Sequence, residues 1–164
     1  MKRIKVINEP TELVPILRAV DTAVKRAVFA KVTADWVTLS QVEKEFGEEG
    51  KSAIAFFEQM KLVDTKWEAT DTGSEKAFHS YYVSFHINTS CPVTEIADVL
   101  FVAVMPDADF AATEKRILQL IGEEGKFAGD IAEALGISST MLKAVVKRSI
   151  ALEYRGHRVE PHKD

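Results

Sequence analysis

The sequence predicts an α+β protein that is mostly helical, with two tandem modules joined by an apolar helix. Three observations predict this. Apolar residues recur at helical spacing over most of the chain, period-two alternation is confined to two short regions, and residues 128–147 match a helix-turn-helix. The 164 residues, 46% hydrophobic and 28% charged, suit one folded domain or two small ones. We expect the modules to span residues 1–106 and 107–164.

The first module is expected to open with a short strand at residues 3–7. Helical spacing then runs over residues 10–34. Ser40 and Glu43 have the spacing of a capping box, so a short helix is expected to begin there and to end at Gly47.

A third helix is predicted at residues 50–61, where apolar side chains share one face. The period then changes to two in residues 62–70, and the aromatic and β-branched residues of 77–89 predict a second strand. Three helices followed by a two-stranded hairpin is the order of a winged helix.

The helix that joins the modules is unusually apolar. Nine of the ten residues of 96–105 are apolar, and Ser90 is expected to cap the helix that contains them. The stretch is too short to cross a bilayer, so it lies in a core or between two copies of the chain. We favour a homodimer interface; burial within one chain is the alternative. The expected interface residues are Ile96, Leu100, Phe101 and Val104.

Residues 128–147 fit the helix-turn-helix pattern at every position that the motif restricts. The fifth position, where the helices cross closely, is Ala132, and the ninth, where the turn favours positive φ, is Gly136. The five core positions are all apolar: Ile131, Leu135, Ile137, Leu142 and Val145.

The second helix of this motif is expected to face DNA. Ser138 is expected to cap it, and Thr140, Lys143, Ala144 and Lys147 fall opposite its apolar side. We expect Lys143 to reach a base and Lys147 a phosphate. The segment LEYRGHRVEP then predicts a minimal hairpin with basic residues at its tip. The candidate DNA contacts are Ser138, Ser139, Thr140, Lys143, Lys147, Arg148, Arg155, His157 and Arg158.

The distribution of charge agrees with this assignment. The chain has a net charge of −4, whereas residues 137–164 have more basic than acidic side chains. A small basic end on an acidic body is typical of a localised binding site, although a solvated tail is the plain alternative.

The first module fits the same motif poorly. Glu43 stands where a small residue is needed, and Glu48 and Glu49 would open the second helix, where DNA phosphates repel them. We therefore expect an architectural and dimerising module. Direct DNA contact is left open by Lys44, Lys51 and Lys66.

Other chemistries find little support. A single cysteine excludes a disulfide framework and favours a reducing cytoplasm. His79, His86 and Cys91 match no usual zinc spacing, and the two histidines differ in strand parity. In GEEGKS, a Walker loop would need glycine where Glu45 stands. We expect no catalytic residue, metal, cofactor, signal peptide or membrane span.

Three segments carry a resemblance to a known family: AIAFFEQMKLVDTKW, HSYYVSFHINTSCP and SSTMLKAVVKRSIALEYRGHRVE. Over nearly its whole length the chain resembles an archaeal group of ArsR-type winged-helix transcriptional regulators. The resemblance implies a sequence-specific DNA-binding regulator, usually a homodimer, in the cytoplasm. The cysteine clusters through which many ArsR-type proteins sense metals are absent from this sequence.

Two functions therefore follow from the sequence. The favoured one is a regulator that binds duplex DNA as a homodimer through the second module. The alternative is a winged-helix module that binds other proteins and has no direct contact with DNA. The sequence identifies no small-molecule effector.

Overall fold

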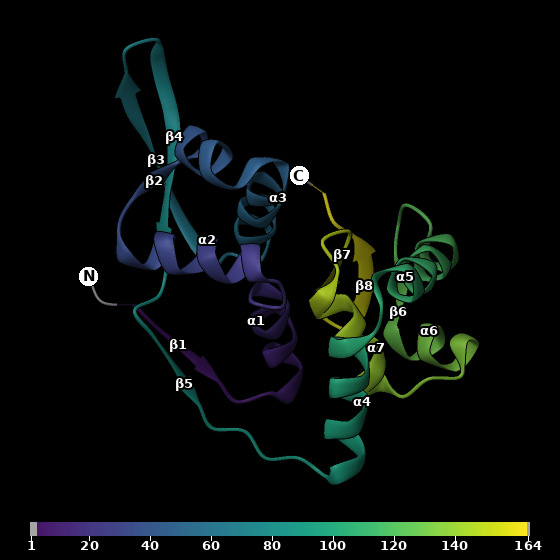
Figure 1. Ribbon diagram of the computed structural model, residues 1–164. Coiled ribbons are helices and arrows are strands. Elements are labelled where there is room, and N and C mark those ends of the chain that lie inside the picture. The colour runs from purple at the N-terminus through teal and green to yellow at the C-terminus, as the bar shows by residue number, and fades with distance from the viewer. Residues whose placement is uncertain (1–2, 164) are drawn as a thin grey trace. The chain divides into compact units, whose positions relative to one another are not determined.

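The computed structural model of the chain describes residues 3–163, which form helices and three small sheets (Figure 1). The predicted α+β class is confirmed. The chain divides into two compact units: unit 1 contains residues 3–6 and 19–87, and unit 2 contains residues 7–18 and 88–163. The boundary expected at residues 106–107 lies inside unit 2, because the helix that precedes it packs within that unit.

Unit 1 places two helices against a three-stranded antiparallel sheet. Strand β4 is central, in the order β2-β4-β3, and the β3–β4 hairpin extends beyond the helices (Figure 1). Val28, Val32, Ile54, Phe57 and Phe78 lie in its core. The elements are α2 (Ala23–Ala34), β2 (Val37–Thr38), α3 (Leu39–Gln59), β3 (Val63–Thr70) and β4 (Gly73–Ser80).

Helix α3 contains both helices that the sequence predicts on either side of Gly47. Gly47 has φ 66° and kinks the helix, a conformation that glycine adopts without steric cost. The expected cap at Ser40 and Glu43 is wrong. Thr38 and Gln41 form the capping box instead, because β2 ends at Thr38 and the helix begins at the next residue.

The strand expected at residues 77–89 is interrupted. β4 ends at Ser80, whose hydroxyl donates to the carbonyl of Tyr82 and closes a bend. The remainder forms β5 (Ser84–Ile87), which pairs with β1 (Ile4–Ile7), so the strand predicted at the start of the chain is confirmed.

Unit 2 repeats the order of unit 1, a helix, a short strand, a helical region and a hairpin whose second strand is central, here β6-β8-β7. Two separate helices form the helical region of unit 2, where unit 1 has the two halves of the kinked helix α3. Two further helical segments pack on this arrangement, α4 and the N-terminal η1–α1. The elements are η1 (Pro10–Glu12), α1 (Leu13–Ala19), α4 (Val93–Val104), α5 (Asp107–Ile121), β6 (Lys126–Phe127), α6 (Ala128–Leu135), α7 (Ser139–Arg148), β7 (Leu152–Arg155) and β8 (Arg158–Pro161).

Helix α4 buries one face and exposes the other. Val99, Val102 and Ala103 are buried against α7, and α4 lies alongside α7 in Figure 1. The expected cap at Ser90 is wrong, because the helix begins only after Pro92, without a side-chain cap. No helix within residues 3–163 combines the length and the apolar character that a membrane crossing requires.

A buried arginine fastens α7 to the end of α4. Arg148 is only 5% exposed and donates hydrogen bonds to the carbonyl oxygens of Val102 (2.8 Å) and Met105 (2.7 Å) and to Asp107 Oδ1 (2.9 Å). Its guanidinium lies 4.3 Å from the centre of the Phe110 ring. Carbonyls at a helix C-terminus have no partner within the helix and favour a nearby cation, so Arg148 satisfies groups that burial would otherwise penalise.

We expect Arg148→Met to lower the free energy of unfolding by about 3 kcal/mol, because it leaves the carbonyls of Val102 and Met105 without their donor. Urea unfolding followed by circular dichroism measures this. Arg155→Met is the matched control: its side chain is 63% exposed, and we expect it to cost less than about 1 kcal/mol. Equal losses for the two variants would contradict the role assigned to Arg148.

Candidate nucleic-acid interface

Helices α6 and α7 form the helix-turn-helix that the sequence predicts. Gly136 ends α6 in the left-handed conformation, at φ 66° and ψ 35°. Ser138 caps α7 as expected, accepting a hydrogen bond from the backbone N–H of Met141, and it donates to Asp98 of α4. Leu142, Val145 and Val146 are buried in the unit's core.

The side of α7 opposite Leu142, Val145 and Val146, which the sequence predicts to be exposed, is covered by other elements of unit 2. Ala144 is fully buried, because α4 packs along this side, and η1 also contacts α7. Thr140, Lys143 and Lys147 are half-buried, and Ser139 is exposed. Helix α7 is therefore the central helix of unit 2, and it has no open face broad enough to enter a major groove in this arrangement.

Lys143 lies beside a carboxylate. Its Nζ is 2.6 Å from Oε2 of Glu9, the residue that precedes η1. The hydrogen bond from Lys143 lowers the pKa of the Glu9 carboxyl, and the charges of Lys143 and Lys147 add to this effect against partial desolvation. The cation that we expected to contact a base is thus neutralised by a residue of its own unit.

The C-terminal hairpin matches its prediction more closely. Arg155, His157 and Arg158 are exposed and lie together around the turn at Gly156. Arg155 Nε bonds to Glu153 at 3.0 Å and lies 3.4 Å from Glu160, while Arg158 donates to the carbonyls of Glu124 and Gly125. The three residues form one surface, as expected. Arg148 does not join it, because it is buried under α4.

Sequence reasoning gave little weight to the second half of α3, after the kink at Gly47. Gly50, Ala53, Ile54 and Phe57 face the core of unit 1, whereas Ser52, Ala55 and Gln59 lie on the opposite side and are exposed. The second half of α3 precedes the hairpin of unit 1 as α7 precedes the hairpin of unit 2. Of these two, the second half of α3 has the open face. The available signal was the helical spacing of the uncharged residues Ser52, Ala55 and Gln59, and the nearby glutamates obscured it.

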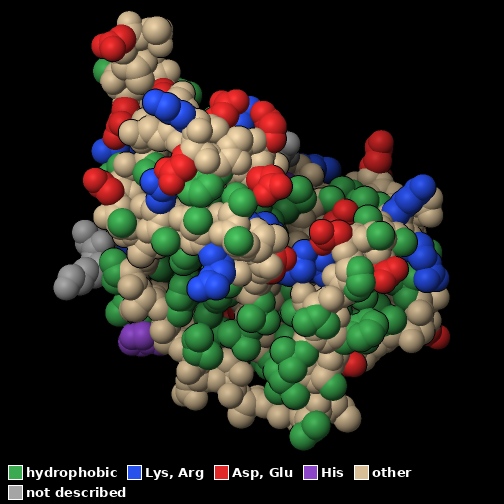
Figure 2. All heavy atoms as spheres, in the orientation of Figure 1, with side chains coloured by type: hydrophobic (Ala, Val, Ile, Leu, Met, Phe, Trp, Pro, Cys, Tyr) green, Lys and Arg blue, Asp and Glu red, His purple; other side chains and the backbone are tan. Residues whose placement is uncertain are grey.

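The residues expected at a dimer interface separate into two groups. Leu100, Phe101 and Val104 are 47%, 56% and 75% exposed and lie on one side of α4, whereas Ile96 packs partly against the core. Figure 2 shows hydrophobic side chains gathered over α4. Val93, also exposed, extends the same stripe by two turns.

The histidines and the cysteine considered as metal ligands do not come together. His79 Nδ1 lies 2.9 Å from the carbonyl oxygen of Ser80, and its ring packs against Trp36. Over residues 3–163 no three His, Cys, Asp or Glu side chains form a group that would hold a metal ion.

The Glu9–Lys143 contact predicts a pH dependence of stability. The folded-state pKa of Glu9 lies below its ordinary value, so the pair's stabilisation is present above the ordinary glutamate range and is lost as the pH falls through the lowered pKa. We expect Glu9→Gln to cost less than about 1 kcal/mol at neutral pH, since both side chains are partly solvated. Urea unfolding should show no such difference from the unchanged protein in acid.

Glu49→Gln, which alters an exposed glutamate of unit 1, is the control and should leave stability unchanged at both pH values. An effect of Glu9→Gln that was the same in acid and at neutral pH would rule out the ion pair as its cause.

A family model described as ArsR transcriptional regulator matches residues 7–163. No curated protein matches the chain significantly.

Proposed function

Because the chain belongs to the ArsR transcriptional regulator family, we propose that it regulates transcription in the cytoplasm as a homodimer bound to duplex DNA. We also infer that both units are winged-helix modules. What supports this is their shared order of helix, strand, helical region and hairpin, with the last strand central in each sheet. The helical region is the kinked α3 in unit 1 and the pair α6 and α7 in unit 2. A regulator of this kind needs no catalytic centre, and we assign none.

The second half of α3 is our choice for the helix that enters the major groove. The observation that carries this choice is the open face of Ser52, Ala55 and Gln59, set against the enclosed equivalent helix α7. A serine hydroxyl can bond to base edges, and the amide of a glutamine such as Gln59 can form a pair of hydrogen bonds with adenine. The β3–β4 hairpin, with Lys66 exposed on it, would lie beside the groove.

The charge of this face predicts how it binds. Glu48 and Glu58 are exposed next to it, and Lys51 lies 3.4 Å from Glu48 and 3.6 Å from Glu43. Few phosphate charges are therefore neutralised, and the affinity should depend only weakly on salt concentration.

A second candidate surface lies in unit 2, at the exposed start of α7 and the hairpin of Arg155, His157 and Arg158. Its support is the exposure of these residues and of Ser138 and Ser139. Thr140, Lys143, Lys147 and Arg148 would take part only if η1 and α4 moved away from α7. This surface would bind mainly through arginines, so a steep salt dependence is expected of it.

Matched serine variants separate the two surfaces. We expect Ser52→Glu to weaken binding to a selected duplex at least about tenfold, because it places a negative charge against DNA, and Ser139→Glu to leave it within about threefold. Fluorescence anisotropy at several salt concentrations measures both. A larger loss for Ser139→Glu than for Ser52→Glu would favour unit 2. In that case Arg155→Ala and Arg158→Ala should each flatten the slope of log affinity against log salt concentration. The change should be about one unit for every DNA phosphate that the variant no longer neutralises. Binding unchanged in all four variants would contradict both surfaces.

The apolar stripe of α4 supports the homodimer. Leu100, Phe101 and Val104 together expose an apolar surface that water solvates poorly, and a second copy of the same stripe would cover it symmetrically.

We expect Leu100→Glu to yield monomers, because dimerisation would bury an unpaired charge. Sedimentation analysis measures the mass. Ile150→Glu is the control, since Ile150 is also about half exposed in unit 2 but lies outside α4. A one-chain mass for the unchanged protein at tens of micromolar would contradict the dimer.

A further inference from the structure

The β3–β4 hairpin has two sides that differ in charge. In an antiparallel pair, residues directly opposite each other share one face of the sheet, and successive residues along a strand alternate between the faces. Asp64, Lys66 and Glu68 therefore lie on one side, together with Glu75, which is opposite Glu68. The other side, which we call the Trp67 side, holds no carboxylate of either strand. Its residues between the core and the tip are Thr65, Trp67, Ala69, Ser74 and Lys76.

The Trp67 side is also the side on which the second half of α3 packs. Phe78, nearer the base of the hairpin on this side, lies in the core that α3 helps to form. Lys76, directly opposite Trp67, extends to α3, where its Nζ lies 2.6 Å from Oε1 of Glu58 in the last turn of the helix. Trp67 therefore continues the α3 face that is proposed to bind DNA, and the inference below rests on that proposed function.

Trp67 is a large side chain with small neighbours. It is 71% exposed, and the hairpin that carries it extends beyond the helices (Figure 1). Thr65 and Ala69 precede and follow it on the same side, and Ser74 lies diagonally across. Over residues 3–163, no aromatic ring or cation packs on the indole. A protein interface would surround such a residue with further apolar surface, whereas a single ring on a narrow hairpin suits a minor groove about 6 Å wide.

We propose that Trp67 enters the minor groove beside the major groove that α3 occupies and inserts between two base pairs of the duplex. An apolar ring inserted there partly unstacks one base step and bends the DNA, and this costs least at the flexible pyrimidine–purine steps. Trp67 thus contributes to specificity through the deformability of the DNA, without a hydrogen bond to a base. The carboxylates of the hairpin do not oppose this approach, because they lie on its other side.

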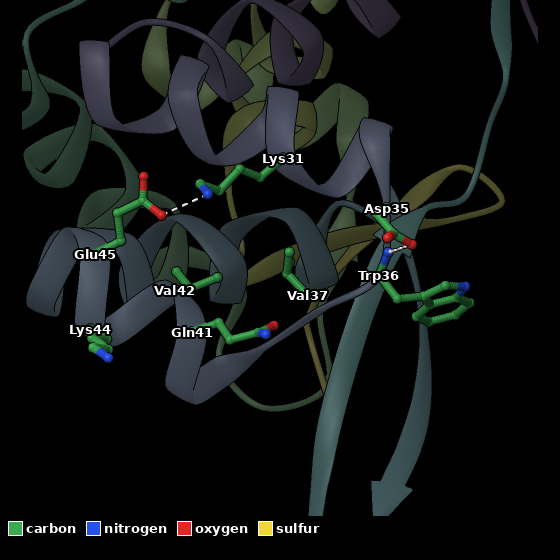
Figure 3. A pocket seen from close by; sticks show the side chains of 8 residues that line it. All are labelled: Lys31, Asp35, Trp36, Val37, Gln41, Val42, Lys44 and Glu45. Carbon is green, nitrogen blue, oxygen red and sulfur yellow. Dashed lines mark hydrogen bonds and ion pairs between the residues drawn. The ribbon is translucent and has the colours of Figure 1, made fainter.

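The second tryptophan of the chain is a natural control. Trp36 lies at the edge of the pocket drawn in Figure 3, and its ring points away from the other side chains that line this pocket. The ring packs against His79, and Lys66 Nζ lies 4.3 Å from its centre. Both partners belong to the side of the hairpin opposite Trp67, so a duplex bound on the Trp67 side should not cover Trp36.

Quenching of tryptophan fluorescence by acrylamide tests the contact, with a duplex that the full chain selects from a random pool. In Trp36→Phe, Trp67 is the only tryptophan left. We expect saturating duplex to abolish most of its quenching, because an inserted ring is shielded from solvent. In Trp67→Phe, which leaves only Trp36, quenching should be the same with and without DNA. A Trp67 that stays as accessible on the duplex as in the free protein overturns the inference.

DNA affinity and bending test insertion itself. Trp67→Ala should weaken binding roughly tenfold, and Trp67→Phe, which keeps a ring, about threefold or less. Trp36→Ala makes the same change on the other side of the sheet and should bind as before, with circular dichroism confirming that each variant is folded. Energy transfer between dyes at the two ends of the duplex should show a bend of about 20° or more that Trp67→Ala reduces. Equal affinities of the two alanine variants, or a duplex that stays straight, overturn insertion.

The outcomes distinguish this inference from the proposed function. A chain that binds no duplex overturns the proposed function and the insertion together. Binding that leaves Trp67 accessible overturns the insertion alone. If Trp67→Ala lowers the mass measured by sedimentation and leaves DNA affinity unchanged, Trp67 contacts a second protein chain, and the insertion is overturned.

Discussion

The arrangement of unit 2 depends on one buried cation. The Arg148 guanidinium, at the end of α7, satisfies the carbonyls of Val102 and Met105 where α4 ends, and it also bonds to Asp107 at the start of α5. Removing it would leave the buried carbonyl of Val102 and the partly buried carbonyl of Met105 without their donor, a cost that few native structures bear. The same contact holds α4 along α7, so Ala144 becomes part of a core. Arg148 thus contributes both to the stability of this unit and to the covering of α7 by α4.

The two units show that a helix-turn-helix sequence and an accessible helix are different properties. The motif's restricted positions, such as Ala132 and Gly136, encode how two helices cross and turn. These positions do not determine which elements cover the other side of the second helix. Unit 2 fits the motif fully and encloses its second helix, whereas unit 1 fits it poorly and leaves Ser52 and Gln59 exposed. In unit 1 the kink at Gly47 takes the place of a separate turn.

Features set by nearby residues could be predicted from the sequence: the turn at Gly136, the cap at Ser138 and the hairpin around Gly156. The predictions were wrong where contacts between segments far apart in the sequence set the local structure. Thr38 rather than Ser40 caps α3, because β2 pairs with β4 and sets the start of the helix. Of the candidate site, the exposed hairpin residues could be predicted. The burial of Arg148 could not, because its carbonyl partner Val102 lies 46 residues away and leaves no periodic mark in the sequence.

Photo-crosslinking tests most directly the claim that α3 rather than α7 faces DNA. A benzophenone side chain is placed at position 52, in the second half of α3, or at position 139, the first residue of α7, and the protein is irradiated on a labelled duplex. Both positions hold exposed serines. We expect crosslinks from position 52 and none above background from position 139. Crosslinks from position 139 alone would contradict the claim, since they would mean that α7 leaves the cover of α4 to meet DNA.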